Sequence, residues 1–199
     1  IHDPLSCKTI LVGDSGVGKT SIIGRYLNHF KENEKVDSAS FSNKLENIDG
    51  NEILFEIWDT AGQERYRSVN TLFYQDHIIY DITSKKSFES LGNYWYNAVK
   101  QNGNNGLIFH IDRNKNDLYE NEDVDRKVVE NYCESIKCLR IEFVSAIDNN
   151  SDIDDMFQIL GRKFIQSDIY KNILVSKTPQ KLSLKEENNN KKIKKKKFC

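Results

Sequence analysis

The sequence predicts an α/β fold, with a mostly parallel sheet of six strands, one antiparallel edge hairpin and helices on both faces. Short apolar runs alternate along the chain with segments of helical period, which is the order of a parallel sheet with crossover helices. The dipeptide Asp49-Gly50 between two strand-like runs is typical of a hairpin turn. We therefore expect one antiparallel strand pair at an edge of the sheet.

The elements are expected in strict alternation after that hairpin. Strands are placed where short apolar or alternating runs occur, and helices where apolar residues recur three and four positions apart. The expected strands cover residues 9–12, 41–48, 53–58, 77–82, 107–111 and 140–144. The expected helices cover residues 19–27, 87–99, 123–136 and 152–169.

The chain length and charge pattern indicate one domain and a tail. A chain of 199 residues that is 38% hydrophobic can bury one good core, which we place in residues 1–175. Residues 176–199 are polar and are expected to be disordered. From Lys181 onward the tail holds eight Lys and two Glu, gathered at the chain end rather than spread over a face. An anionic membrane surface is therefore a better partner for it than nucleic acid.

The cysteines favour a reducing compartment. Cys7, Cys133, Cys138 and Cys199 form no C-x-x-C pair and no metal-ligand pattern with His, which argues against a disulfide scaffold. We expect a cytoplasmic protein in which the first three cysteines are small core residues. The four histidines show no spacing typical of a metal site or a catalytic base.

A complete P-loop, GDSGVGKT, runs from Gly13 to Thr20 between the first strand and the first helix. Its glycines let successive main-chain N–H groups converge on phosphate oxygens, and the helix adds its positive end. Lys19 is expected to reach the terminal phosphates and Thr20 to give its hydroxyl to Mg²⁺. The expected nucleotide-binding residues of this stretch are Asp14, Ser15, Gly16, Val17, Gly18, Lys19, Thr20 and Ser21.

A second motif, WDTAGQE, begins at Trp58 at the end of a strand. Asp59 lies where open α/β sheets bind ligands, and its carboxylate can hold Mg²⁺ through a water. Gly62 offers a main-chain N–H that can approach a terminal phosphate, and Gln63 can orient an attacking water. Lys19 and Gln63 are therefore the candidate catalytic residues.

A third motif, NKND, follows the strand at 107–111. The Asp117 carboxylate can accept two hydrogen bonds from the N1–H and N2–H₂ edge of guanine, which adenine cannot offer. Lys115 can lay its methylene stem over the base, and Asn114 can tie neighbouring loops together. The three motifs together predict a protein that binds guanine nucleotide with Mg²⁺.

From about Cys7 to Ile169 the chain resembles the Ras superfamily of small GTPases, and GDSGVGKTS, WDTAGQERYRS and YDIT at Tyr80–Thr83 resemble its Rab family. ASF at Ala39–Phe41 with Lys44, and FEIWDTAGQERY, are most similar to the early-endosomal Rab branch. The resemblance implies a monomeric GTP/GDP switch in vesicle trafficking that cycles to the cytosolic face of an endomembrane. Its partners would be an exchange factor, an activating protein and effectors. Hydrolysis would be slow without a partner, because no arginine is an obvious finger.

The resemblance also assigns roles to residues outside the three motifs. Phe30 would pack on the guanine, and the main chain of Ser145, Ala146 and Ile147 would approach its carbonyl oxygen. Cys199 is a candidate for geranylgeranylation, although there is no C-a-a-X box. The remaining role is an aromatic trio shown to effectors, for which ordinary core packing is the alternative, formed by Phe41, Trp58 and Phe73.

Three departures from the Rab pattern leave alternatives open. Val36 stands where a Thr would contact Mg²⁺ and the γ-phosphate, and only a local shift could let Asp37, Ser38 or Ser40 replace it. Ile147 replaces a packing Lys. The chain between Tyr74 and Tyr80 is about four residues short, so we expect an unwound second-switch helix, a frayed sheet or an incomplete sequence. A degenerate binding module is thus one alternative, and another P-loop class, such as a nucleotide kinase, is a second.

Overall fold

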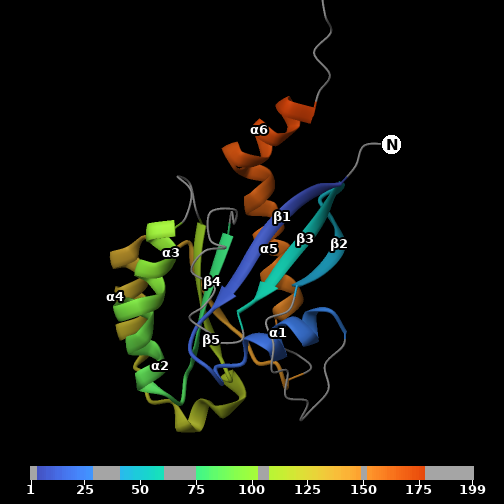
Figure 1. The fold of residues 1–199 in the computed structure, drawn as a ribbon. Coiled ribbons are helices and arrows are strands. Elements are labelled where there is room, and N and C mark those ends of the chain that lie inside the picture. Colours follow the sequence, from blue (N-terminus) through green and yellow to red (C-terminus); the bar gives the residue numbers. More distant parts are fainter. Residues whose placement is uncertain (1–3, 29–40, 61–74, 103–107, 149–151, 178–199) are drawn as a thin grey trace, which may run out of the picture.

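The fold is seen in a computed structural model, which describes residues 4–28, 41–60, 75–102, 108–148 and 152–177. Figure 1 shows one twisted sheet with helices on both faces. The strands are β1 (Leu5–Val12), β2 (Phe41–Ile48), β3 (Asn51–Asp59), β4 (Gln75–Asp81), β5 (Ile108–Asn114) and β6 (Arg140–Phe143). The helices are α1 (Lys19–Tyr26), α2 (Lys85–Ser90), the π-helix η3 (Leu91–Trp95), α3 (Tyr96–Asn102), the 3₁₀-helix η4 (Asn116–Asn121), α4 (Arg126–Ile136), α5 (Ile153–Gln166) and α6 (Asp168–Lys177).

The sheet has the predicted topology. Its six strands lie in the order β2-β3-β1-β4-β5-β6, and only β2 and β3 are antiparallel. Their hairpin turns at Asp49 and Gly50, both with positive φ, as a two-residue turn between twisted strands requires. The expected α/β fold with one antiparallel edge pair is confirmed.

Strand β4 corrects the expectation of a frayed centre. Its seven residues pair with β5 in continuous register, from Gln75 opposite Ile108 to Asp81 opposite Asn114, and its first four pair with β1. The sequence placed the start at His77 because the residues before it are polar. The sheet is continuous over the stretch between Tyr74 and Tyr80 that is short against the Rab pattern. The second-switch helix that was expected to unwind lies in residues 61–74, outside the described residues.

Two apolar cores lie on opposite faces of the sheet. One is closed by α1 and α5, where the rings of Tyr26 and Phe157 stack with centroids 3.6 Å apart. Gly161 lets α5 approach the hairpin, because a Cβ there would lie 2.8 Å from Ile48. The other core packs η3, α3 and α4 against the opposite face, with Leu91 and Val129 fully buried.

The cysteines differ in part from the expectation. Cys7 is a buried thiol in the first core, as predicted, and burial raises the pKa of its thiol to about 12. Cys133 and Cys138, however, form a disulfide. Lys137, in the left-handed conformation at the end of α4, turns the chain back and leaves the two cysteine Cα atoms 5.0 Å apart. The spacing rule missed this pair because the turn, not a C-x-x-C spacing, brings the residues together.

The helices show how far the last of them runs into the predicted tail and whether any of them could span a membrane. α6 runs to Lys177, so the first two residues of the predicted tail, Ser176 and Lys177, lie in this helix. Among the helices that the structure describes, none has the length and apolar character needed to cross a bilayer.

Candidate functional site

The phosphate loop joins the end of β1 to the start of α1. Gly13 has φ +148° and Gly18 has φ +100°, and a Cβ would lie 2.3 Å from the Ile79 carbonyl oxygen at the first and 2.1 Å from Asn114 Nδ2 at the second. No side chain fits at either position. The loop is therefore shaped by close backbone approach to β4 and to the end of β5.

Lys19 is held inside this loop. Its side chain is 4% exposed, and its ammonium donates to the carbonyl oxygens of Gly13 and Asp14, both at 2.8 Å. Burial lowers its pKa to about 8, although the nearby carboxylates of Asp59 and Asp14 act in the opposite direction. The ammonium thus lies inside the loop, where a phosphate would offer it charged acceptors in addition to these neutral ones.

The two predicted magnesium ligands meet at the carboxyl end of β3. The Thr20 hydroxyl donates to Asp59 Oδ2, and Asp59 is almost fully buried. Thr60, the next residue, donates to the Leu11 carbonyl at 3.0 Å and fixes this end of β3 against β1. Mg²⁺ is usually held by one or two protein oxygens together with waters and phosphates, so the pair fits that ion. In the described residues no group of three or more His, Cys, Asp or Glu side chains is arranged to hold a metal ion.

The NKND motif, which the sequence predicts to choose the base, lies beside the phosphate loop. Asn114 donates through Nδ2 to the Val17 carbonyl at 2.6 Å, which ties the two loops together as the sequence suggested. The exposed Asp117 accepts a hydrogen bond from the buried Ser145 hydroxyl. This bond orients a carboxylate that stays open to solvent.

Lys115 is fixed by an ion pair with Asp81 at the end of β4. Burial alone would raise the pKa of Asp81, but hydrogen bonds from Lys115 and Thr83 outweigh it and hold that pKa below its usual range. Lys115 itself has φ +63°, in the left-handed region. The head group is thus anchored while the stem can cover a flat ligand.

Arg25 is a site residue that the sequence did not reveal. From the last turn of α1 it donates to the carbonyl oxygens of Ala146 at 2.8 Å and Ile147 at 3.1 Å. The Ser145 hydroxyl also accepts from the N–H groups of Ile147 and Asp148, each at 3.2 Å. The loop is therefore shaped although Ile147, in the place of the family's Lys, is 56% exposed.

Two of the three predicted effector-facing aromatics lie on the antiparallel hairpin. Phe41 on β2 is 48% exposed, and its ring lies 5.0 Å from that of Trp58, its partner across the strand pair. Core packing is thus excluded for Phe41, while the half-buried Trp58 also packs on the second core. Of the predicted site residues, Phe30, Gly62, Gln63, Phe73 and Cys199 lie outside the described residues, as do Val36, Asp37, Ser38 and Ser40 of the first switch.

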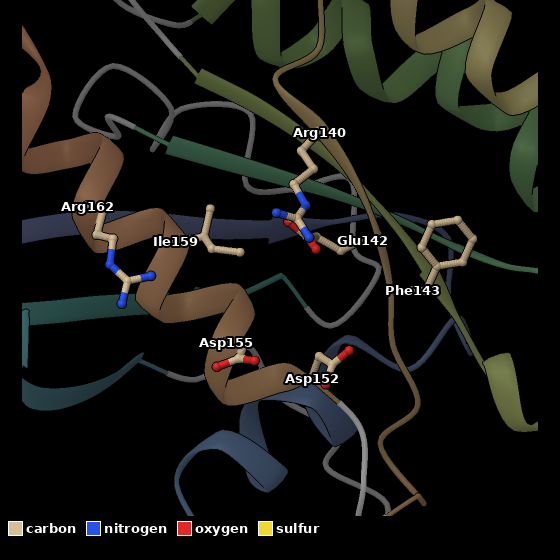
Figure 2. Close-up of a pocket in the computed structure, with 7 residues that line it drawn as sticks. All are labelled: Arg140, Glu142, Phe143, Asp152, Asp155, Ile159 and Arg162. Carbon is tan, nitrogen blue, oxygen red and sulfur yellow. The ribbon is translucent and has the colours of Figure 1, made fainter.

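A cavity of about 230 Å³ lies between β6 and α5 (Figure 2), and its lining residues are Arg140, Glu142, Phe143, Asp152, Asp155, Ile159 and Arg162. None of them belongs to the three motifs. Arg140 pairs with Glu142 at 3.1 Å, and Arg162 lies 3.4 Å from Asp49. Because both arginines already face carboxylates, the cavity is less suited to phosphate than the loop at Lys19.

The fold and the loops at its carboxyl edge define a P-loop protein of the small GTPase class. The sequence model of the Ras family matches residues 8–166, and the chain belongs to that family. It is 37% identical over 172 residues to Ras-related protein Rab-31 of Rattus norvegicus, covering 83% of this chain and 86% of that protein. It is 34% identical over 173 residues to RabJ of Dictyostelium discoideum, covering 82% and 66%. It is also 33% identical over 167 residues to Rab-22A of Homo sapiens, covering 81% and 84%. The predicted membership of the Rab family is confirmed.

Proposed function

We propose that this Rab-type protein binds GDP and GTP with Mg²⁺ and hydrolyses GTP slowly, as a switch in vesicle trafficking. The observation that carries the proposal is the hydrogen bond from Asn114 to the Val17 carbonyl. It joins the loop that would hold phosphate to the loop that would hold the base, so one ligand can contact both.

Each step of the proposed chemistry has a residue. Lys19 and the loop amides neutralise phosphate charge, while Thr20 and Asp59 hold Mg²⁺. Asp117, oriented by Ser145, selects guanine. Gln63 places water in line with the γ-phosphate. Phosphoryl transfer asks the protein mainly for positioning and charge stabilisation, and since the sequence offers no obvious arginine finger, we expect an activating partner to add charge.

The base-specifying residue offers the sharpest test. Asp117→Asn replaces one carboxylate oxygen with an amide that donates, so the guanine N–H edge loses an acceptor, whereas the C2 oxygen of xanthine gains a donor. We expect GDP affinity to fall at least tenfold and affinity for xanthosine diphosphate to rise, measured by competition. Asp155→Asn, the same change at an exposed site on α5, is the matched control. Unchanged purine preference in Asp117→Asn would contradict the proposal.

A degenerate module that binds partners without switching is the second candidate. Exposed Ile147 favours it, because the packing that the family obtains from Lys is missing at the base. Val36 adds to this, since valine offers no oxygen to Mg²⁺. Such a module would bind an effector equally with GDP and with a non-hydrolysable GTP analogue, whereas a switch would prefer the analogue.

The tail and Cys199 support a membrane-bound part of the cycle. The lysines of the tail should attract an anionic leaflet with about 1 kcal/mol per Lys near the surface. One lipid chain attached to the protein, together with such a basic patch, is enough for stable anchoring. The resemblance to the early-endosomal branch favours an endosomal membrane. Co-sedimentation with vesicles with and without phosphatidylserine, before and after prenylation of the full chain, tests this.

A further inference from the structure

The side chain of Asp14 in the phosphate loop is held by one helical segment. Asp14 Oδ2 accepts a hydrogen bond from the Ser90 hydroxyl at 2.8 Å, and Oδ1 accepts one from the Trp95 indole N–H at 2.8 Å. Both donors lie far away in the sequence, at the two ends of the π-helical turn η3. A carboxylate in the phosphate loop is thus fixed on the η3 side by two donors.

The π turn explains why these two donors can act together. Residues five positions apart in an α-helix point about 140° away from each other around the axis. A π turn pairs residue i with residue i+5 and brings such residues to one side. Ser90 immediately precedes η3, and Trp95, five positions later, is its last residue. The irregular turn therefore places both side chains beside Asp14. Isolated π turns occur often at functional sites.

The main chain of Asp14 is part of the lysine pocket. Its carbonyl oxygen accepts from the Lys19 ammonium at 2.8 Å, and the Val17 N–H also points at it, at 3.5 Å. Fixing the carboxylate therefore also fixes the carbonyl that positions Lys19. It also keeps one negative charge in a defined place, which matters because an unrestrained carboxylate near a polyphosphate would repel it.

We propose that Ser90 and Trp95 are positioning residues for the phosphate loop, holding Asp14 so that bound nucleotide is retained. This inference rests on the proposed function, because it concerns retention of guanine nucleotide. Packing is a separate contribution, since the Trp95 ring is 7% exposed within the second core. The test must therefore remove the N–H group and keep an aromatic ring.

The experiment compares GDP dissociation rates from four full-length proteins. Trp95→Phe loses only the donor and part of the ring, and we expect GDP to dissociate about tenfold faster. Ser90→Ala should have a smaller effect in the same direction, because a hydroxyl donor is lost without loss of packing. Tyr96→Phe is the matched control, since its ring packs on Phe109 rather than on the loop, and its rate should equal that of the wild type.

A comparison with Asp14→Ala separates the hydrogen bonds from general packing. Asp14→Ala removes the acceptor shared by Ser90 and Trp95 and leaves the Trp95 ring in place, so it should release GDP as fast as Trp95→Phe. Adding Ser90→Ala to Asp14→Ala should not change that rate further. A Trp95→Phe rate equal to the wild-type rate would overturn the inference alone. Loss of GDP from wild type and Tyr96→Phe as well would overturn the proposed function and, with it, this inference.

A spectroscopic measurement covers the case in which Trp95→Phe does not fold. The chain has two tryptophans, so Trp58→Phe leaves Trp95 as the single emitter. Asp14→Ala in this variant should shift the Trp95 emission and speed GDP dissociation, because the indole N–H group loses its acceptor. An Asp14→Ala change that leaves both the emission spectrum and the GDP dissociation rate unaltered would overturn the inference.

Discussion

Two stacked histidines lie inside the sheet, and replacing each of them with leucine is expected to change the stability of the protein in opposite directions. His77 on β4 lies opposite His110 on β5, both are fully buried, and their ring centroids are 4.8 Å apart. His77 Nδ1 lies 2.8 Å from Asp112 Oδ2. Neither ring nitrogen of His110 has a hydrogen-bond partner among the described residues. The His77 ring therefore serves a buried acceptor through Nδ1 and leaves only Nε2 without a partner among the described residues, whereas the His110 ring brings two such nitrogens.

His110→Leu should raise the free energy of unfolding at pH 7 by about 1–3 kcal/mol. That is the usual cost of a buried polar group without a partner, and leucine of similar size removes it. His77→Leu is the matched change on the neighbouring strand. It should lower the free energy of unfolding by about 3 kcal/mol or more, because it leaves the buried Asp112 carboxylate without its donor.

The pH dependence provides a second magnitude. Burial lowers the pKa of His110 well below 6.5, and electrostatic interactions with His77, Arg140 and Lys163 act in the same direction. The His110 imidazole therefore takes up a proton near pH 6.5 in the unfolded chain but stays neutral in the native protein. The free energy of unfolding falls as the pH drops below that value. Between pH 7 and pH 5 this one group removes at most about 1.9 kcal/mol. The advantage of His110→Leu over the wild type should grow by that amount.

Urea unfolding followed by circular dichroism at pH 7, 6 and 5 measures both effects. Subtracting the free energy of unfolding of the wild type from that of His110→Leu at each pH removes the contribution of other titrating groups. One of these is Glu142, whose pKa is raised by burial and by Asp112. A His110→Leu variant that is less stable than the wild type at pH 7 would contradict the cost assigned to the His110 ring. A difference in the free energy of unfolding that is the same at all three pH values would contradict its lowered pKa. A stabilising effect of His77→Leu would contradict the role of His77 as the partner of Asp112.

Three further predictions concern the nucleotide site. Gly18→Ala should abolish GDP retention, because its Cβ would lie 2.1 Å from the Asn114 amide at φ +100°; nucleotide content of the purified protein measures this, and a normal content contradicts it. GDP affinity should fall up to tenfold per unit as the pH rises above about 8, since burial lowers the pKa of Lys19 to about 8 and the neutral amine cannot pair with phosphate; flat titration-calorimetry values from pH 7 to 9 would argue against this. Gln63→Leu should slow GTP loss in a single-turnover assay while GDP affinity stays nearly unchanged, and equal rates would count against the role of Gln63.

The sequence predicted the features that local patterns encode. The alternation of strands and helices, the hairpin at Asp49-Gly50 and the loop from Gly13 to Thr20 all follow from short-range spacing, and the structure has them. Strand β4 was underestimated because its first two residues, Gln75 and Asp76, are polar. Hydropathy does not identify polar residues that pair in a sheet.

Long-range contacts could not be predicted. Arg25 reaches the Ala146 carbonyl across 121 positions, and Trp95 reaches Asp14 across 81, with no spacing rule to link either pair. The disulfide between Cys133 and Cys138 depends on the left-handed turn at Lys137, a conformation that is rare for lysine. Such contacts are set by where the sheet brings separate loops together, which composition and period do not specify.

Helix α1 connects two parts of the site with one short rod about 12 Å long. Its first turn carries Lys19 and Thr20, and its last turn carries Arg25, which supports the Ala146 carbonyl. A tilt of this helix would therefore move Lys19 and Thr20 at one end and Arg25 at the other end together. A nucleotide that contacts both ends would lose its phosphate contacts and its base contacts in one step. A partner that displaces α1 alone could thus release the nucleotide.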